Sequence, residues 1–172
     1  QRGMHIFGKV PEGEDIWDFL YSILRFDQGE GSLRYEIAGS MGLSLEDLLS
    51  RQEMFDTTRG KSYGQLLEEI DVLGRRIVRD VLSPPSAEED RSPLPVTLPP
   101  GVLGSITGRV RDLADRTRKS DETGALLNGM SGGFTPPGPS GLITRGHDAV
   151  LPTGRNFYSL DPATVPSKAA WR

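Results

Sequence analysis

The stretch between residues 132 and 162 most limits how this chain can fold. It reads GGFTPPGPSGLITRGHDAVLPTGRNFYSLDP, with too much glycine and proline for a helix and too many apolar residues for plain disorder. Loops of this length in compact domains are usually either functional or disordered. Because the stretch also carries arginines, a histidine and a Phe-Tyr pair, we expect an irregular segment whose side chains are candidates for binding.

Helical spacing of apolar residues dominates the rest of the chain. The clearest series has steps of four, three, four and four residues, and it ends at Ser83-Pro84-Pro85, where the prolines should stop a helix. Residues 4–11, MHIFGKVP, are typical of a short extended segment. The elements that the spacing predicts are a helix over 16–24, two short helices around Gly42 with Ser44 as an N-cap, a helix through Leu66, Ile70, Leu73, Ile77 and Val81, a helix over 103–113, and a short helix capped at Ser120 or Asp121.

Proline content suggests a division of the chain into four parts. Residues 83–100 hold six of the 13 prolines, which is typical of a linker or a long surface loop. The fold class that we predict is mainly α with irregular, extended Gly/Pro-rich segments. Its parts are an extended segment followed by helices (1–82), the linker or surface loop (83–100), a second helical region (101–131) and a Gly/Pro-rich region (132–172).

Composition excludes several classes of function. A net charge of -4, without a dense stripe of Lys and Arg, argues against a nucleic-acid surface. The absence of cysteine excludes disulfides and thiolate metal cages, and it fits a cytoplasmic location. No apolar run reaches 18 residues, so we expect no membrane span. The phosphate-binding loop of P-loop ATPases is also missing, so we do not expect this chain to hydrolyse ATP by that route.

Two arginines in the Gly/Pro-rich region are candidates for binding an acidic ligand. The guanidinium groups of Arg145 and Arg155 match carboxylates in shape, and backbone N–H groups of glycine-rich loops bind anions. The alternative is that these arginines pair with neighbouring acids such as Asp148 and Asp161.

The two histidines and the acidic residues near residue 14 give weaker signals. His5 precedes an apolar pair, which is typical of a partly buried histidine, and His147 is typical of a solvated loop residue. The acidic side chains could attract a cation, or they could simply favour the positive end of a helix. They are Glu12, Glu14, Asp15 and Asp18.

The two ends of the chain resemble a known family. FTPPGPSGLITRGHDAVLPTGRNFYSLDPATVPSKAAW is similar to the loop of the large subunit of aerobic-type cobaltochelatase, and MHIFGKVPEGE and ALLNGMSGG resemble the segments before it. The related magnesium chelatase subunit typically has Lys in place of Arg155 and lacks the Phe-Tyr pair. The family usually has a simpler step where this chain reads RGHDAV, so His147 is not assigned a role.

The resemblance implies a function for a larger molecule. Members are several-fold longer, so this chain would be an internal section of a multi-domain α/β chelatase subunit. The large subunit binds a tetrapyrrole, hydrogenobyrinic acid a,c-diamide, and cobalt, which is the metal substrate. Separate ATPase subunits carry ATP and Mg, and cobalt insertion is a step toward cobalamin.

The same resemblance assigns candidate site residues. Arg145, Arg155 and Asn156 would hold the acidic rim of the tetrapyrrole, and Phe157 and Tyr158 would offer apolar faces, as would Phe134. His5 or Glu14 would deliver the metal or accept pyrrole protons, and His5 is the candidate metal ligand. Two alternatives stay open: a magnesium chelatase large subunit acting on protoporphyrin, and a helical interaction module without chemistry of its own.

Overall fold

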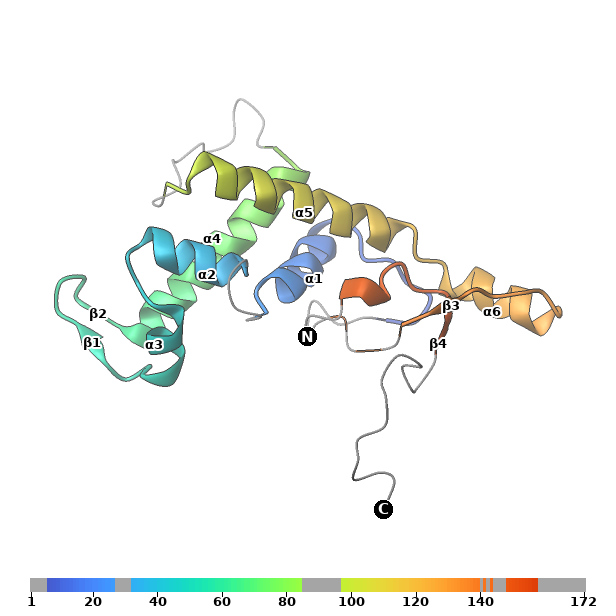
Figure 1. The fold of residues 1–172 in the computed structure, drawn as a ribbon, viewed down its shortest axis with the longest axis horizontal. Helices are drawn as coiled ribbons and strands as arrows, with labels where there is room; N and C mark the ends of the chain where they lie inside the picture. The colour runs from blue at the N-terminus through green and yellow to red at the C-terminus, as the bar shows by residue number, and fades with distance from the viewer. Residues whose placement is uncertain are drawn as a thin grey trace, which may run out of the picture.

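Helices dominate the computed structural model, which describes residues 6–26, 32–84, 97–139, 141, 143 and 148–157 (Figure 1). The predicted fold class, mainly α with irregular Gly/Pro-rich segments, is confirmed. None of the helices in these ranges is both long and apolar enough to cross a membrane. The helices are α1 (Glu14–Leu24), α2 (Leu33–Ser40), α3 (Leu45–Ser50), α4 (Tyr63–Leu82), α5 (Pro100–Arg118) and α6 (Glu122–Met130).

Short strands and one 3₁₀ turn complete the described elements. The strands β1 (Phe55–Asp56) and β2 (Lys61–Ser62) pair in antiparallel orientation just before α4. The strands β3 (Pro137–Gly138) and β4 (Asn156–Phe157) pair in parallel orientation within the Gly/Pro-rich region. The 3₁₀ turn η2 (Asp148–Val150) precedes β4.

Helix α4 lies at the centre of the core, and its apolar stripe follows the predicted spacing. Leu66, Ile70, Leu73 and Ile77 are buried, whereas Val81 is partly buried at the edge. Helices α1, α2, α3 and α5 all contact α4. Since most helical stability in proteins comes from burying one apolar face, these contacts explain why the short helices form. Their fully buried side chains include Phe19, Leu20, Ile23, Leu33, Ile37, Leu48, Val110 and Leu113.

Helices from the first and the third predicted part of the chain therefore share one core. Helix α5 begins at Pro100, earlier than the predicted Leu103, and proline is well tolerated in the first turn of a helix. Just before it, Leu98 is buried. The division into 1–82, 83–100, 101–131 and 132–172 remains a prediction.

Side chains cap the starts of several helices. The predicted cap Ser44 accepts a hydrogen bond from the backbone of the first turn of α3. Asp121, one of the two predicted caps for α6, accepts one from Gly124 N at 2.8 Å. Ser62 and Gln65 form a reciprocal capping box at the start of α4, so the hairpin passes directly into the central helix.

The N-terminal segment, defined here as residues 6–11, turns back on itself instead of running extended as predicted. Ile6 and Lys9 form an isolated antiparallel bridge, and Lys9 N donates to Ile6 O at 3.1 Å. Gly8 between them has a φ of 72°, a conformation that glycine adopts without steric cost. Met4 and His5 lie outside the described residues.

The β1–β2 hairpin was not expected from the sequence. The Asp56 carboxylate shapes its turn by accepting hydrogen bonds from Thr58 N at 2.9 Å and Arg59 N at 3.0 Å. The Arg59 side chain also pairs with this carboxylate, and these contacts hold the pKa of Asp56 below its ordinary value. Strands of two residues leave no alternation pattern in a sequence, because the pattern needs four or more positions to be visible.

A charged network ties α1 and α2 to α4. Arg34 donates from Nε and Nη2 to the two carboxylate oxygens of Asp71, each at 2.7 Å, and the Tyr21 hydroxyl donates to the same carboxylate. Burial alone would raise the pKa of Asp71, but the hydrogen bonds from Arg34 and Tyr21 outweigh it, and the pKa lies below its ordinary value. Burial and the bond to Asp71 raise the pKa of Tyr21. The network therefore favours an ionised carboxylate next to a neutral phenol.

Replacing Asp71 by Asn should destabilise the fold. The substitution leaves the Arg34 guanidinium, whose side chain is 14% exposed, without its carboxylate partner. We expect a loss of about 1–3 kcal/mol in the free energy of unfolding, measured by urea denaturation with circular dichroism. Asp47→Asn is the matched control, because Asp47 pairs with Arg51 at 3.6 Å on the surface. Equal losses in the two variants would contradict the role of the network.

The stability difference between the wild type and Asp71→Asn should depend on pH. The folded pKa of Asp71 lies below the unfolded value of about 3.9. The contribution of the carboxylate is therefore complete above that value and is lost as the pH falls through the folded pKa. Urea titrations should show a constant difference between about pH 7 and pH 5 and a narrowing difference below about pH 4. A difference that widens on acidification would show the opposite sign of the shift.

Candidate functional site

The N-terminal segment and the Gly/Pro loop, defined here as residues 132–157, meet at the junction of α5 and α6. Gly8 N donates to Glu122 Oε2 at 2.6 Å, across 114 positions in the sequence. On the loop side, Thr153 N donates to Ser120 Oγ at 2.9 Å, and Asp121 N donates to Thr153 O at 3.3 Å. The N-terminal segment thus contacts the first residue of α6, and the loop contacts the turn directly before it.

A pocket of about 180 Å³ lies where these segments meet. Whole ligand sites usually measure about 300–1,000 Å³, so this pocket is too small to enclose a tetrapyrrole. The residues that line this pocket can therefore supply a wall of a larger site, but the pocket is not the whole of such a site. The lining residues are Gly8, Lys9, Val10 and Pro11 from the N-terminal segment, Phe19 from α1, Leu151 and Thr153 from the loop, and Thr117, Ser120, Asp121, Glu122 and Thr123 from the helix junction.

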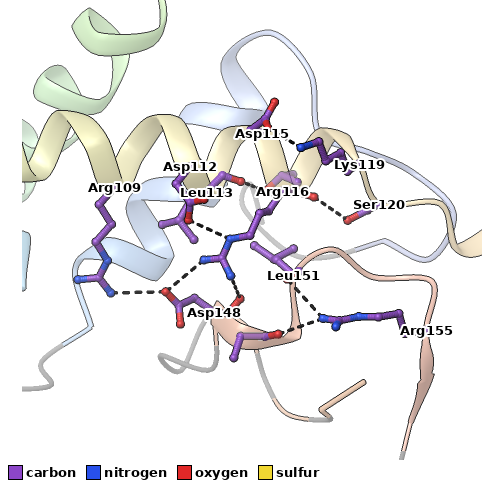
Figure 2. Close-up of polar contacts among 12 residues, drawn as sticks. Arg109, Asp112, Leu113, Asp115, Arg116, Lys119, Ser120, Asp148, Leu151 and Arg155 are labelled. Atoms are coloured by element: carbon purple, nitrogen blue, oxygen red, sulfur yellow. Dashed lines mark hydrogen bonds and ion pairs between the residues drawn. The ribbon is translucent and has the colours of Figure 1, made fainter. Parts of the chain in front are cut away.

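Ion pairs fasten the loop to the side of α5 (Figure 2). The Asp148 carboxylate at the start of η2 lies 3.6 Å from Arg116 Nη2 and 3.7 Å from Arg109 Nη2. Arg116 also donates from Nη1 to the backbone oxygen of Asp148 at 3.2 Å, and its Nε lies 3.0 Å from the Asp112 carboxylate. Directly after this contact, Val150 and Leu151 are buried in the core. Charge and apolar burial together hold this part of the loop.

The Arg155 guanidinium lies against the backbone of its own loop. Nη2 donates to Ala149 O and Val150 O at 3.1 Å and to Leu151 O at 3.4 Å, the last of which Figure 2 shows, and Nε donates to Pro152 O at 3.1 Å. Asp148, the expected neighbouring partner, pairs with the arginines of α5 instead. Within the described residues, the hydrogen bonds of Arg155 use Nε and Nη2, which leaves Nη1 for a further acceptor.

Two glycines of the loop permit close backbone approach. Gly154 has a φ of 94°, and a Cβ atom added there would lie 2.4 Å from Asp121 O. A Cβ atom added at Gly138, in β3, would lie 2.8 Å from Arg155 Nε. Side chains at either position would push the loop away from α6 or from Arg155, so the glycines serve the internal packing of the loop.

The turn between α5 and α6 is preceded by a strongly basic helix end. Arg116 and Arg118 occupy the last turn of α5, where positive charge is favourable for the helix dipole. The Lys119 ammonium lies 2.8 Å from the exposed Asp115 carboxylate (Figure 2). This hydrogen bond lowers the pKa of Asp115 and raises that of Lys119. Both groups remain on the surface, outside the contacts that hold the loop.

Glu14, the second candidate for proton or metal transfer, lies away from the loop. It stands at the start of α1 and lines a surface pocket of about 370 Å³ together with Trp17 and arginines of α4. Asp18 in the same pocket lies 3.9 Å from Arg75. Glu14 and Asp18 thus share a pocket with basic side chains of α4, and the described structure does not bring Glu14 and Arg155 into one pocket.

The other candidates fall largely outside the described residues. His5, Arg145 and Tyr158 are not described, and Asn156 and Phe157 are described only through the backbone of β4. Phe134, in the loop, is 81% exposed. Among the described residues, no group of three or more His, Cys, Asp or Glu side chains could hold a metal ion.

Sequence reasoning missed the residues that organise this junction. Glu122 is only 8% exposed, accepts the bond from Gly8, and lines both the first pocket and a second pocket beside Arg155. Arg109 and Arg116 were also missed, although a signal existed. Their spacing of seven residues places them two turns apart on one side of a helix, where they can share an acidic partner, but the predicted helix over 103–113 ends before Arg116.

Comparisons with known proteins place the chain in a family. It matches the CobN/Magnesium Chelatase family over residues 1–172. An uncharacterized protein of Methanocaldococcus jannaschii is 37% identical over 99% of the chain, and the aerobic cobaltochelatase subunit CobN of Sinorhizobium sp is 32% identical over 98%. The chain spans only 12% and 15% of the length of these relatives.

A solved structure also matches almost the whole chain with a small part of a longer protein. The catalytic subunit of cobaltochelatase from Mycobacterium tuberculosis matches 99% of this chain with a TM-score of 0.56 and 27% identity, and the match covers 14% of that subunit. The structural match therefore agrees with the sequence matches in extent. The chain belongs to the CobN/magnesium chelatase family.

Proposed function

We propose that this chain is a section of the large subunit of an ATP-dependent cobaltochelatase. The reaction would insert cobalt into a corrin-type tetrapyrrole, hydrogenobyrinic acid a,c-diamide, during cobalamin biosynthesis in the cytoplasm. One observation carries the proposal. The two stretches that resemble the cobalt-type subunit, which lie far apart in the sequence, contact the same helix junction and line the same pocket. This convergence is expected if both stretches serve one binding site.

The loop is suited to receive a rigid, flat ligand. A tetrapyrrole brings four nitrogen ligands for the metal, so the protein needs to hold the ring and to leave the metal free to enter it. The ion pairs of Asp148 and the carbonyl contacts of Arg155 fix residues 148–155 without a ligand, which reduces the entropy lost on binding. Phe134, exposed in the loop, offers an aromatic face for the ring.

The proposal extends to groups beyond the described residues. His5 and Glu14 remain our candidates for delivering the metal or accepting the pyrrole protons, and Arg145, Asn156, Phe157 and Tyr158 remain candidates for binding the ring. ATP and Mg would bind to separate ATPase subunits. Glu14 lines a pocket with residues of α4, and His5 lies outside the described residues.

The choice of tetrapyrrole tests the proposal. Full-length large subunit should bind hydrogenobyrinic acid a,c-diamide at least about tenfold more tightly than protoporphyrin, in titrations followed by absorbance or fluorescence quenching. Tighter binding of protoporphyrin would instead favour the magnesium chelatase alternative. Binding of neither compound would favour a helical module that only contacts a partner.

The proposed role of Arg155 can be separated from its role in shaping the loop. Arg155→Ala removes both the contacts to the loop carbonyls and any contact to a substrate carboxylate. The loss through loop shape should be the same for the acidic tetrapyrrole and for a fully amidated analogue. A charge-assisted hydrogen bond to the acidic rim should add a further loss of about tenfold or more, seen only with the acidic compound.

Controls make the Arg155 experiment decisive. Arg118→Ala removes an exposed arginine of α5 and should change neither affinity. Arg155→Lys keeps the charge but not the planar fork, and it should recover part of the loss with the acidic compound. Equal losses of both compounds in Arg155→Ala would assign this residue to loop shape alone, and unchanged affinities would remove it from the site.

A further inference from the structure

Helix α6 presents an apolar surface that the described residues do not cover. The α6 surface, defined here as Leu126, Leu127 and Met130, has side chains that are 50%, 58% and 77% exposed. Figure 1 shows α6 leading away from the core helices, and its described neighbours are the N-terminal segment and the Gly/Pro loop, from which Phe7 and Thr135 line a pocket with Leu126. Of the nine residues of α6, only Glu122 is buried. Exposed apolar side chains that lie close together on one helix indicate a candidate interaction site.

The sequence of α6 makes an uncovered state costly. Isolated helices shorter than about 12–15 residues are marginal in water, and α6 has nine residues, including Gly124 and Gly129. Glu122 and the cap Asp121 fix its first turn, but they do not stabilise its later turns. Leu127 and Met130, three positions apart, lie on neighbouring turns, so one partner surface could bury both.

We infer that the α6 surface is covered by the remainder of the large subunit. The inference rests on the proposal that this chain is a section of that subunit. Relatives that match almost the whole chain, and the solved cobaltochelatase subunit, extend far beyond the matched part, which is 12–15% of their length. A large amount of polypeptide is thus available in the same molecule, at high effective concentration.

The chemistry of the surface favours a permanent contact within one polypeptide. None of its three side chains is charged, and the only charged residue of α6, Glu122, is buried in the first turn of the helix. Permanent interfaces resemble a protein core in composition, whereas interfaces that form and dissociate are more polar. A tetrapyrrole with an acidic rim would require cationic side chains, which the α6 surface lacks.

Oxidation of methionine measures this coverage in the native, full-length subunit. Met130 is 77% exposed and Met54, on the segment before the hairpin, is 45% exposed, so an uncovered Met130 should react faster with dilute hydrogen peroxide. If the subunit covers α6, Met130 should form sulfoxide at least about fivefold more slowly than in urea, and more slowly than Met54. Peptide mass spectrometry gives both rates in one sample without any substitution.

Further measurements show what covers the α6 surface. The inference is wrong if Met130 reacts as fast in the native subunit as in urea. It is also wrong if Met130 becomes protected only after the ATPase subunits or the tetrapyrrole are added, or only at high protein concentration. Protection in the dilute subunit alone supports it. A subunit that binds no tetrapyrrole but protects Met130 contradicts the proposed function and leaves this inference standing.

Discussion

The shape of the Gly/Pro loop depends on the position of Asp148 between two arginines of α5. Outside the short β3–β4 pair, side chains satisfy part of the loop backbone, and Arg116 reaches both the carboxylate and the backbone oxygen of Asp148. Each such partly exposed ion pair contributes only about 0–1 kcal/mol. Burial of Val150 and Leu151 contributes about 1.5–3 kcal/mol each, so apolar burial supplies most of the energy, and the ion pairs fix where the loop attaches.

Helix α5 connects this loop to the core because its apolar side chains pack in the core and its arginines bind the loop. Val110 and Leu113 are fully buried against the helices around α4, whereas Arg109 and Arg116 point to the loop. The network of Asp71 ties α1 and α2 to α4. A displacement within the core would therefore move α5 and, with it, the seat of the loop. The stability of the helical part and the geometry of the site are consequences of the same packing.

Local chemistry made part of this structure predictable. The stripe of α4, its end before Pro84 and the cap at Ser44 depend on residues within a few positions of each other, and they follow the predicted pattern. The resemblance located the segments that meet at the site, but not their contacts. The turn at Gly8 accompanies a bond to Glu122, 114 positions away, and the partner of Asp148 comes from α5. Such pairings depend on the tertiary fold, which no short sequence pattern contains.

Two glycines of the loop show that its sequence preserves a particular backbone shape. Gly154 allows the backbone to touch Asp121, and Gly138 leaves room for the Arg155 side chain, so both positions are explained by contacts inside the junction. The loop sequence thus encodes a shape that forms before any ligand binds. Glu122 holds the first turn of α6 to the N-terminal segment, while the apolar surface of α6 points to a partner elsewhere. If the remainder of the subunit covers that surface, α6 is fixed from two sides, and the wall offered to a tetrapyrrole is set by the whole polypeptide as well as by its own loop.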